Sequence, residues 1–108
     1  MQKVNTIEEF TQLLNENDKL FLLKNSTTCP VSHEAYKEFT KFAEAEPGGT
    51  FFYLNVQEAR PLSNAIAEQF EVKHESPQAL LYSGGKIVWH ASHWNVTASK
   101  LKAEWNKL

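Results

Sequence analysis

The sequence predicts an α/β fold: a central mixed β-sheet of four to five strands flanked by four helices, in a single domain over residues 1–108. Three observations lead to this prediction. Short apolar or β-branched runs alternate with segments whose apolar residues recur at helical spacing. The last two such runs are separated by Gly84-Gly85, as in a hairpin. A chain of 108 residues can bury one hydrophobic core but not two.

The first part of the chain predicts two helices and two central strands. Thr6-x-x-Glu9 is a capping box that opens a helix over 6–16, with a short edge strand just ahead of it. Residues 19–24 form a continuous apolar run bounded by lysines, as expected of a strand buried on both faces. A second helix begins at Pro30 and stops at Pro47-Gly48-Gly49. The aromatic and β-branched run 50–56 then follows as the second central strand.

The second part predicts a helix, a hairpin and a final helix. The third helix begins near Pro61 and repeats apolar residues every four positions as far as Phe70. Ser76-Pro77 introduces a strand over 78–82, and the glycine pair returns the chain as a strand over 86–90. Thr97 is positioned to cap the last helix.

Strand–helix–strand alternation predicts parallel pairing through right-handed crossovers, and the terminal hairpin adds an antiparallel edge. In an open sheet of this kind, chemistry lies in the loops beyond the carboxyl ends of the strands. Cys29 lies in such a loop, directly after the run 19–24.

Cys29 is the only cysteine, and its surroundings favour a reactive thiol over a buried structural one. It stands at the start of a helix, where unpaired N–H groups and the helix dipole stabilise a thiolate. Pro30 suits the first helical position, and the hydroxyl of Ser32 could donate to the sulfur. The alternative is a small apolar residue beneath a loop. The flanking residues, in the stretch S-T-T-C-P-V-S-H, are too polar for a core position.

These features together resemble the thioredoxin fold: a cysteine after the first long strand, a proline opening a helix, and Ser76-Pro77 ahead of a Gly-Gly hairpin. Within that fold, T-C-P-V-S and E-S-P-Q-A-L-L-Y-S-G-G-K resemble the monothiol bacilliredoxins. That family acts on bacillithiol, a low-molecular-weight thiol that some bacteria use in place of glutathione. The resemblance extends over essentially the whole chain and implies a cis bond at Pro77, facing Cys29.

The resemblance implies a thiol–disulfide oxidoreductase that removes bacillithiol from protein mixed disulfides. Cys29 would be the catalytic nucleophile and bacillithiol a co-substrate, with no permanently bound cofactor. The partners would be bacillithiolated client proteins. The expected substrate contacts are Thr28, Pro30, Val31, Ser32, Ser76 and Pro77. Thioredoxins carry a second cysteine where this chain has Ser32, so only chemistry through a mixed disulfide with an outside thiol is open to it.

Composition excludes several other function classes. A net charge of −2 and the lack of a basic stripe argue against nucleic-acid binding. The longest apolar run, Leu20 to Leu23, is too short to span a membrane. The amphipathic amino terminus does not read as a secretory signal, and one cysteine cannot form an internal disulfide. The expected location is therefore the reducing cytoplasm.

Several alternatives stay open at this stage. Cys29 and His33 have a spacing that can share a metal, but the other histidines are scattered, so no metal site is expected. A cysteine–histidine hydrolase has no supporting signature. The tryptophans are most simply packing residues, although Trp94 lies in a loop and could line a ligand surface. A thioredoxin-like adaptor that uses the groove between Cys29 and Pro77, or a general redox-sensing thiol protein, is the alternative function.

Overall fold

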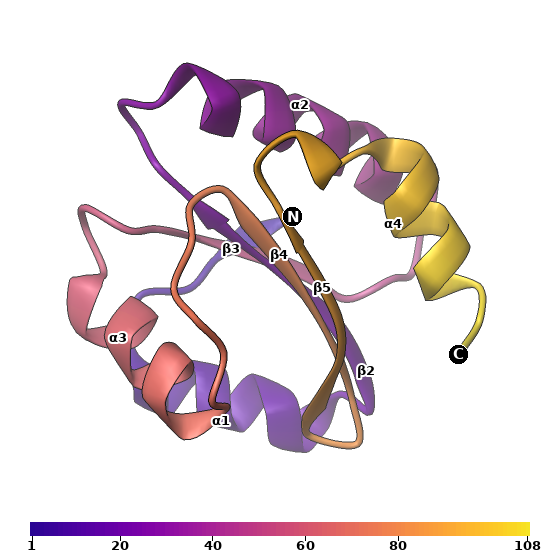
Figure 1. Cartoon of the computed structure of the whole chain (residues 1–108). Helices are drawn as coiled ribbons and strands as arrows, with labels where there is room; N and C mark the ends of the chain where they lie inside the picture. The colour runs from indigo at the N-terminus through magenta and orange to yellow at the C-terminus, as the bar shows by residue number, and fades with distance from the viewer.

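A five-stranded sheet with helices on both faces forms the centre of the computed structural model, which describes residues 1–108 (Figure 1). The strands are β1 (Gln2–Lys3), β2 (Lys19–Asn25), β3 (Phe51–Asn55), β4 (Gln78–Ser83) and β5 (Lys86–Ser92). The helices are α1 (Ile7–Glu16), α2 (Pro30–Glu44), α3 (Arg60–Gln69) and α4 (Ala98–Trp105), with a 3₁₀ turn η1 (His93–Asn95) ahead of α4. The predicted fold class is confirmed, including the short edge strand.

The strand order is β1-β3-β2-β4-β5. The expected parallel pairing holds among β1, β3 and β2, whereas β4 runs antiparallel to β2, and β5 antiparallel to β4. The alternation of strands and helices along the sequence therefore predicted the wrong direction for β4. The reason is the segment 70–77, which follows α3 and returns the chain to the carboxyl end of β2 before β4 begins (Figure 1).

Each face of the sheet carries its own apolar cluster. Alternate residues of β2 point to opposite faces, so Leu20 and Leu22 join one cluster while Phe21 and Leu23 join the other. Helices α1 and α3 cover the first cluster, and α2 and α4 cover the second (Figure 1). The prediction that this strand is buried on both faces is confirmed.

Local signals in the sequence determine where several elements begin. The Thr6 hydroxyl accepts the Glu9 backbone N–H at 3.2 Å, and the Thr97 hydroxyl accepts the Lys100 N–H at 3.3 Å, so both predicted caps are present. Gly84 and Gly85 both have positive φ, at 59° and 79°, which the β4–β5 turn requires.

Candidate active site

Cys29 is the residue immediately before the first turn of α2. Its backbone is extended (φ −100°, ψ 124°), and its carbonyl accepts the His33 N–H at 3.1 Å, the first bond of the helix. Pro30 occupies the first helical turn, where its missing N–H costs no hydrogen bond. The thiol is partly exposed to solvent. The cysteine therefore lies where unpaired helix N–H groups converge and where an incoming disulfide can reach it.

The helix start favours the thiolate form of Cys29. Its pKa is lowered chiefly by a hydrogen bond from the Ser32 backbone N–H, with further contributions from the Val31 N–H and the Ser32 hydroxyl, while partial burial opposes them. Ser32 is completely buried, and its Oγ accepts the Ser26 N–H at 3.1 Å. Because Oγ is the acceptor in that bond, its own proton is free to point toward the sulfur. A lowered cysteine pKa, as the sequence predicted, gives more nucleophile at neutral pH.

Gln57 holds the loop that leads into Cys29, and no sequence motif pointed to it. Its side-chain oxygen accepts the Thr27 N–H at 3.1 Å. Its amide nitrogen donates to Ser26 Oγ at 2.8 Å and to Thr28 Oγ1 at 3.3 Å. One side chain from the β3–α3 connection thus binds three consecutive residues ahead of the cysteine.

A second set of bonds fixes the same loop to β3. The Val56 N–H donates to the Asn25 carbonyl at 2.8 Å, and the Asn25 amide donates to Asn55 Oδ1 at 2.9 Å. The loop 26–28 is therefore hydrogen-bonded to the β3 side of the sheet at its start, through Asn25, and along its course, through Gln57.

Ser76-Pro77 lies at the same end of the sheet as Cys29. The peptide bond between the two residues is cis, which confirms that part of the prediction. Gln78, the next residue, pairs with Lys24 near the end of β2, and the chain then continues toward Cys29. Pro77 is buried, and Ser76 is partly exposed.

The other predicted substrate contacts differ in accessibility. Thr28 and Pro30 are exposed and Val31 is partly exposed, so all three offer surface beside the cysteine. Ser32 is buried beneath them. A role in substrate binding stays a prediction for these residues and for Ser76 and Pro77.

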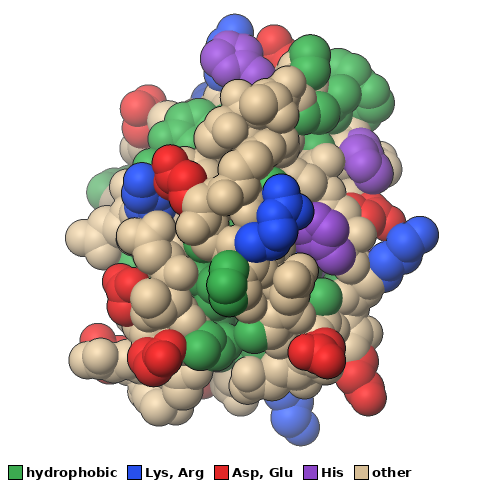
Figure 2. Space-filling model, turned by 90° about the vertical axis from the view of Figure 1, so that its left-hand side faces the viewer, with side chains coloured by type: hydrophobic (Ala, Val, Ile, Leu, Met, Phe, Trp, Pro, Cys, Tyr) green, Lys and Arg blue, Asp and Glu red, His purple; other side chains and the backbone are tan.

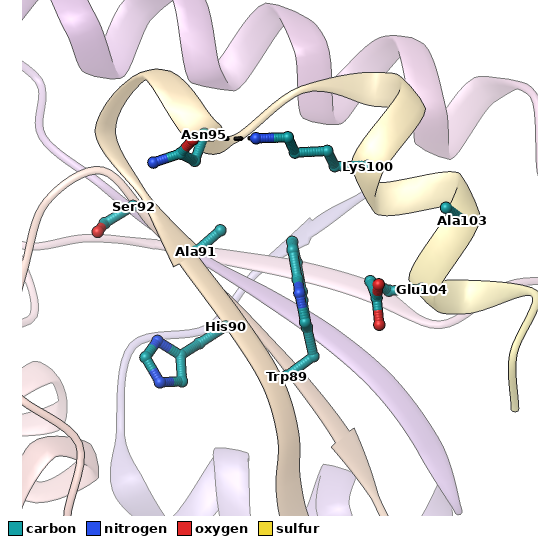
Figure 3. Close-up of a pocket in the computed structure, with 8 residues that line it drawn as sticks. All are labelled: Trp89, His90, Ala91, Ser92, Asn95, Lys100, Ala103 and Glu104. Atoms are coloured by element: carbon teal, nitrogen blue, oxygen red, sulfur yellow. Dashed lines mark hydrogen bonds between the residues drawn. The ribbon is translucent and has the colours of Figure 1, made fainter.

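Among the hollows on the surface of the molecule, one contains the cysteine. The hollow beside Cys29 has a volume of about 350 Å³ and is lined by Asn25, Ser26, Thr27, Cys29, His33, Tyr36, Tyr53 and Asn55. A larger hollow of about 540 Å³ lies between β5 and α4 (Figure 3). The smaller hollow is the candidate active-site cavity because it holds the only nucleophilic thiol.

Lys24 is a buried cation near this end of the sheet, on the face that α3 covers. The side chain is 0% exposed, and its Nζ donates to the Ser63 carbonyl at 3.0 Å and lies 3.3 Å from His74 Nδ1. Burial lowers the pKa of Lys24 to about 8. Burial, followed by the charge of Lys24, also lowers the pKa of His74.

The surface around the site has no single dominant charge. Figure 2 shows the side of the molecule on which the loop between β2 and α2 lies, with basic, acidic and hydrophobic side chains interspersed. No group of three or more His, Cys, Asp or Glu side chains comes together as a metal site. None of the helices combines the length and apolar character needed to cross a membrane.

Solved structures with the same architecture support the fold. A thioredoxin-fold protein with a provisional assignment as an oxidoreductase is 42% identical over 94% of this chain and 89% of that chain, with a TM-score of 0.89. Mitochondrial thioredoxin 3 from Saccharomyces cerevisiae is 24% identical over 100% and 95% of the two chains, with a TM-score of 0.79. Thioredoxin from Fasciola hepatica is 18% identical over 99% and 98%, with a TM-score of 0.80.

The two thioredoxins are similar to this chain in fold alone, since their identities are low. The sequence model of one family matches far more specifically: monothiol bacilliredoxin BrxC, over residues 2–101. That range includes Cys29, Ser32 and Pro77, and the site built around them is equipped for thiol redox chemistry with a single cysteine. The chain belongs to the monothiol bacilliredoxin family.

Proposed function

We propose that the protein removes bacillithiol from protein mixed disulfides through the thiolate of Cys29. One observation carries this proposal: the only thiol of the chain is partly exposed at the start of α2, where the Ser32 and Val31 N–H groups lower its pKa. Membership of the bacilliredoxin family supports bacillithiol as the small thiol. Bacillithiol acts as a co-substrate, and no bound cofactor takes part.

The first step is an exchange of one disulfide for another. The Cys29 thiolate attacks the bacillithiol sulfur of the mixed disulfide, a new S–S bond forms, and the bond to the client sulfur breaks. The client leaves as a thiolate and takes a proton from solvent. No net oxidation occurs, because one disulfide is consumed and one is formed.

The second step needs an outside thiol, because Ser32 stands where a resolving cysteine would be. A second bacillithiol thiolate attacks the bacillithiol sulfur bound to Cys29, releasing bacillithiol disulfide and restoring the thiolate of Cys29. Both steps require free thiols, which fits a reducing cytoplasm as the proposed setting. Rates should increase with the thiolate fraction of the attacking cysteine and with a lower pKa of the leaving thiol.

A single-turnover exchange experiment tests the proposal. A client protein with one bacillithiolated cysteine is mixed with the wild-type protein, and intact masses of both are followed by mass spectrometry. The client should lose one bacillithiol, and Cys29 should gain one. Cys29→Ser is the matched control and should leave the client modified.

Three results would overturn the proposal. The client could stay bacillithiolated, as expected of an adaptor that binds without exchange. Cys29 could become linked to the client protein instead of the small thiol, which would place the attack on the wrong sulfur. A glutathionylated client could react as fast as the bacillithiolated one, which would indicate a general thiol-exchange protein.

A further inference from the structure

Trp94 is the most exposed of the large hydrophobic side chains, at 69%. The two other tryptophans differ from it: Trp105 is 8% exposed and stacks on Phe21, and Trp89 also packs against Phe21, edge to face. Packing therefore accounts for those two and not for Trp94. Burying an indole against a partner is energetically favourable, and tryptophan is therefore among the residues that contribute most to binding at protein interfaces.

Hydrogen bonds hold the turn that carries Trp94 in place. His93, immediately before it, has φ 56°, a left-handed conformation that is uncommon outside glycine and persists only where the surroundings hold it. The His93 N–H donates to the Pro77 carbonyl at 2.9 Å, and the His93 ring lies 3.8 Å from the Glu75 carboxylate. The Ser92 hydroxyl donates to the same carboxylate. A turn whose backbone is already ordered loses little entropy when a partner covers it.

These bonds place Trp94 at the active-site end of the molecule. Pro77 is next to Gln78, which pairs with the end of β2 that leads to Cys29. The turn η1 also packs against α2, the helix that begins after Cys29. A polypeptide whose cysteine sulfur reaches Cys29 therefore has Trp94 within its neighbourhood.

Two features beside Trp94 favour an extended polypeptide as the occupant. β5 is the outermost strand, so one edge of its backbone is unpaired and can bind another strand. Its pairing with β4 is regular from Trp89 to Ser92, and the irregularity that would blunt this edge comes only beyond Leu81, toward the hairpin. Ser92 and Asn95, which precede and follow Trp94 in the sequence, line the hollow between β5 and α4, whose volume of about 540 Å³ can hold a side chain (Figure 3).

The hollow is of mixed polarity, which also suits a peptide. Lys100 Nζ donates to Asn95 Oδ1 at 2.9 Å across one end, as the dashed line in Figure 3 marks. Glu104 and the Trp89 ring line the other end. An extended segment offers both the amides and the side chains that such a lining can contact.

We propose that Trp94, with the hollow between β5 and α4, binds an extended segment of the client polypeptide beside its modified cysteine. This inference rests on the proposed function only in that the substrate is a protein disulfide. An apolar client side chain packs on the indole, and the segment adds to the free edge of β5. This surface therefore discriminates between protein disulfides and small disulfides, because a small disulfide has no polypeptide segment that could bind to it.

The test compares two substrates with the same reacting sulfur. One is a ten-residue peptide with a bacillithiolated cysteine and a leucine three positions away, and the other is bacillithiol disulfide. Trp94→Ala should slow exchange with the peptide by about fivefold or more, as for an interface anchor, and change exchange with bacillithiol disulfide less than twofold. Trp94→Phe should recover part of the loss. Val88→Ala, which trims a residue that is 50% exposed near the hairpin, should change neither rate.

A readout without bacillithiol keeps this inference separate from the proposed function. The same peptide, activated as its 2-nitro-5-thiobenzoate disulfide, is linked directly to Cys29, and tryptophan fluorescence is recorded. The emission of the wild type should shift to shorter wavelength on linkage, and the shift should be absent in Trp94→Ala. Equal losses with both substrates, an unchanged peptide rate, or no shift on linkage would overturn the inference. A dimer of this chain that Trp94→Ala dissociates would overturn it too, since a second copy would then be the occupant.

Discussion

Replacing Lys24 by methionine is expected to make the protein more stable near neutral pH. Lys24 is 0% exposed and forms no ion pair; its ammonium donates to the Ser63 carbonyl and faces the His74 ring. Removing a buried charge from water is costly unless an opposite charge compensates it, and none does here. Methionine has a similar length and no charge to desolvate.

The pKa of Lys24 gives the size of the effect. The difference between the ordinary value of 10.5 and the folded value of about 8, at 1.36 kcal/mol for each pKa unit, corresponds to about 3 kcal/mol. Losing the hydrogen bond to Ser63 takes back about 1 kcal/mol. The net gain for Lys24→Met at pH 7 is therefore about 2 kcal/mol.

The same difference fixes the pH dependence. Between pH 8 and 10.5 the unfolded chain holds the lysine proton while the folded protein has lost it, so the unfolded state binds more protons and stability rises with pH. Below pH 8 both states are protonated and the full cost is present. The stability of the wild type should thus increase from pH 8 to 10, and that of Lys24→Met should lack this increase.

Urea unfolding at pH 7, 8, 9 and 10 measures both quantities. All proteins should carry Cys29→Ser, because the lowered pKa of Cys29 also makes stability rise with pH in this range. Stopping at pH 10 limits the opposite contribution of Tyr82, whose pKa is raised by burial, because an unfolded tyrosine titrates only near pH 10. Lys86→Met, at the exposed start of β5, is the matched control and should change little. A flat profile for the Lys24 protein, or a less stable methionine variant, would refute the reasoning.

Three further predictions concern single side chains. Gln57→Leu keeps the approximate shape of the side chain but removes its three hydrogen bonds to the loop before Cys29. The pKa of Cys29 should therefore rise, and its thiol–disulfide exchange should slow by roughly three- to tenfold. Thiolate absorbance against pH and exchange kinetics measure the two effects. Tyr82→Phe removes a buried hydroxyl that has no hydrogen-bond partner and should stabilise the protein by about 1 kcal/mol in urea unfolding. A loss of stability would show instead that the hydroxyl is hydrogen-bonded in the folded protein. Ser32→Cys should form an internal disulfide with Cys29 while a mild oxidant takes up two electrons, seen as a loss of two hydrogen atoms in the intact mass. A variant that gives only mixed disulfides would contradict the loop geometry.

Signals confined to a few neighbouring residues were sufficient to predict most of the fold. The caps at Thr6 and Thr97 act within one helical turn, and the Gly84-Gly85 turn depends on its own two φ angles. The run 19–24 predicted a strand buried on both faces because every position between its lysines is apolar. Such features are visible in sequence because the contacts that they depend on lie close in the chain.

Local signals predicted neither the burial of Lys24 nor the direction of β4. A lysine at the end of an apolar run is ordinarily a solvated boundary, whereas here α3 and the segment that carries His74 both lie over the Lys24 side chain. The direction of β4 depends on the path of residues 70–77, which have no periodic pattern from which a path can be predicted. Both outcomes are set by contacts between segments more than 30 residues apart, as the Lys24–Ser63 bond illustrates.

Activation and recognition at this site depend on different kinds of contact, and this is why one was easier to predict than the other. The groups that lower the pKa of Cys29 are the backbone N–H groups of Val31 and Ser32, which any helix start supplies two or three residues along the chain. The groups that hold the loop before the thiol, and the indole that we propose binds clients, come from elsewhere: Gln57 from the β3–α3 connection, and Trp94 from a turn whose His93 N–H donates to the Pro77 carbonyl. A short motif can therefore indicate a reactive cysteine without information from the rest of the chain. The contacts of the loop ahead of that cysteine depend on where the fold brings Gln57, and residues 28–32 do not encode that position.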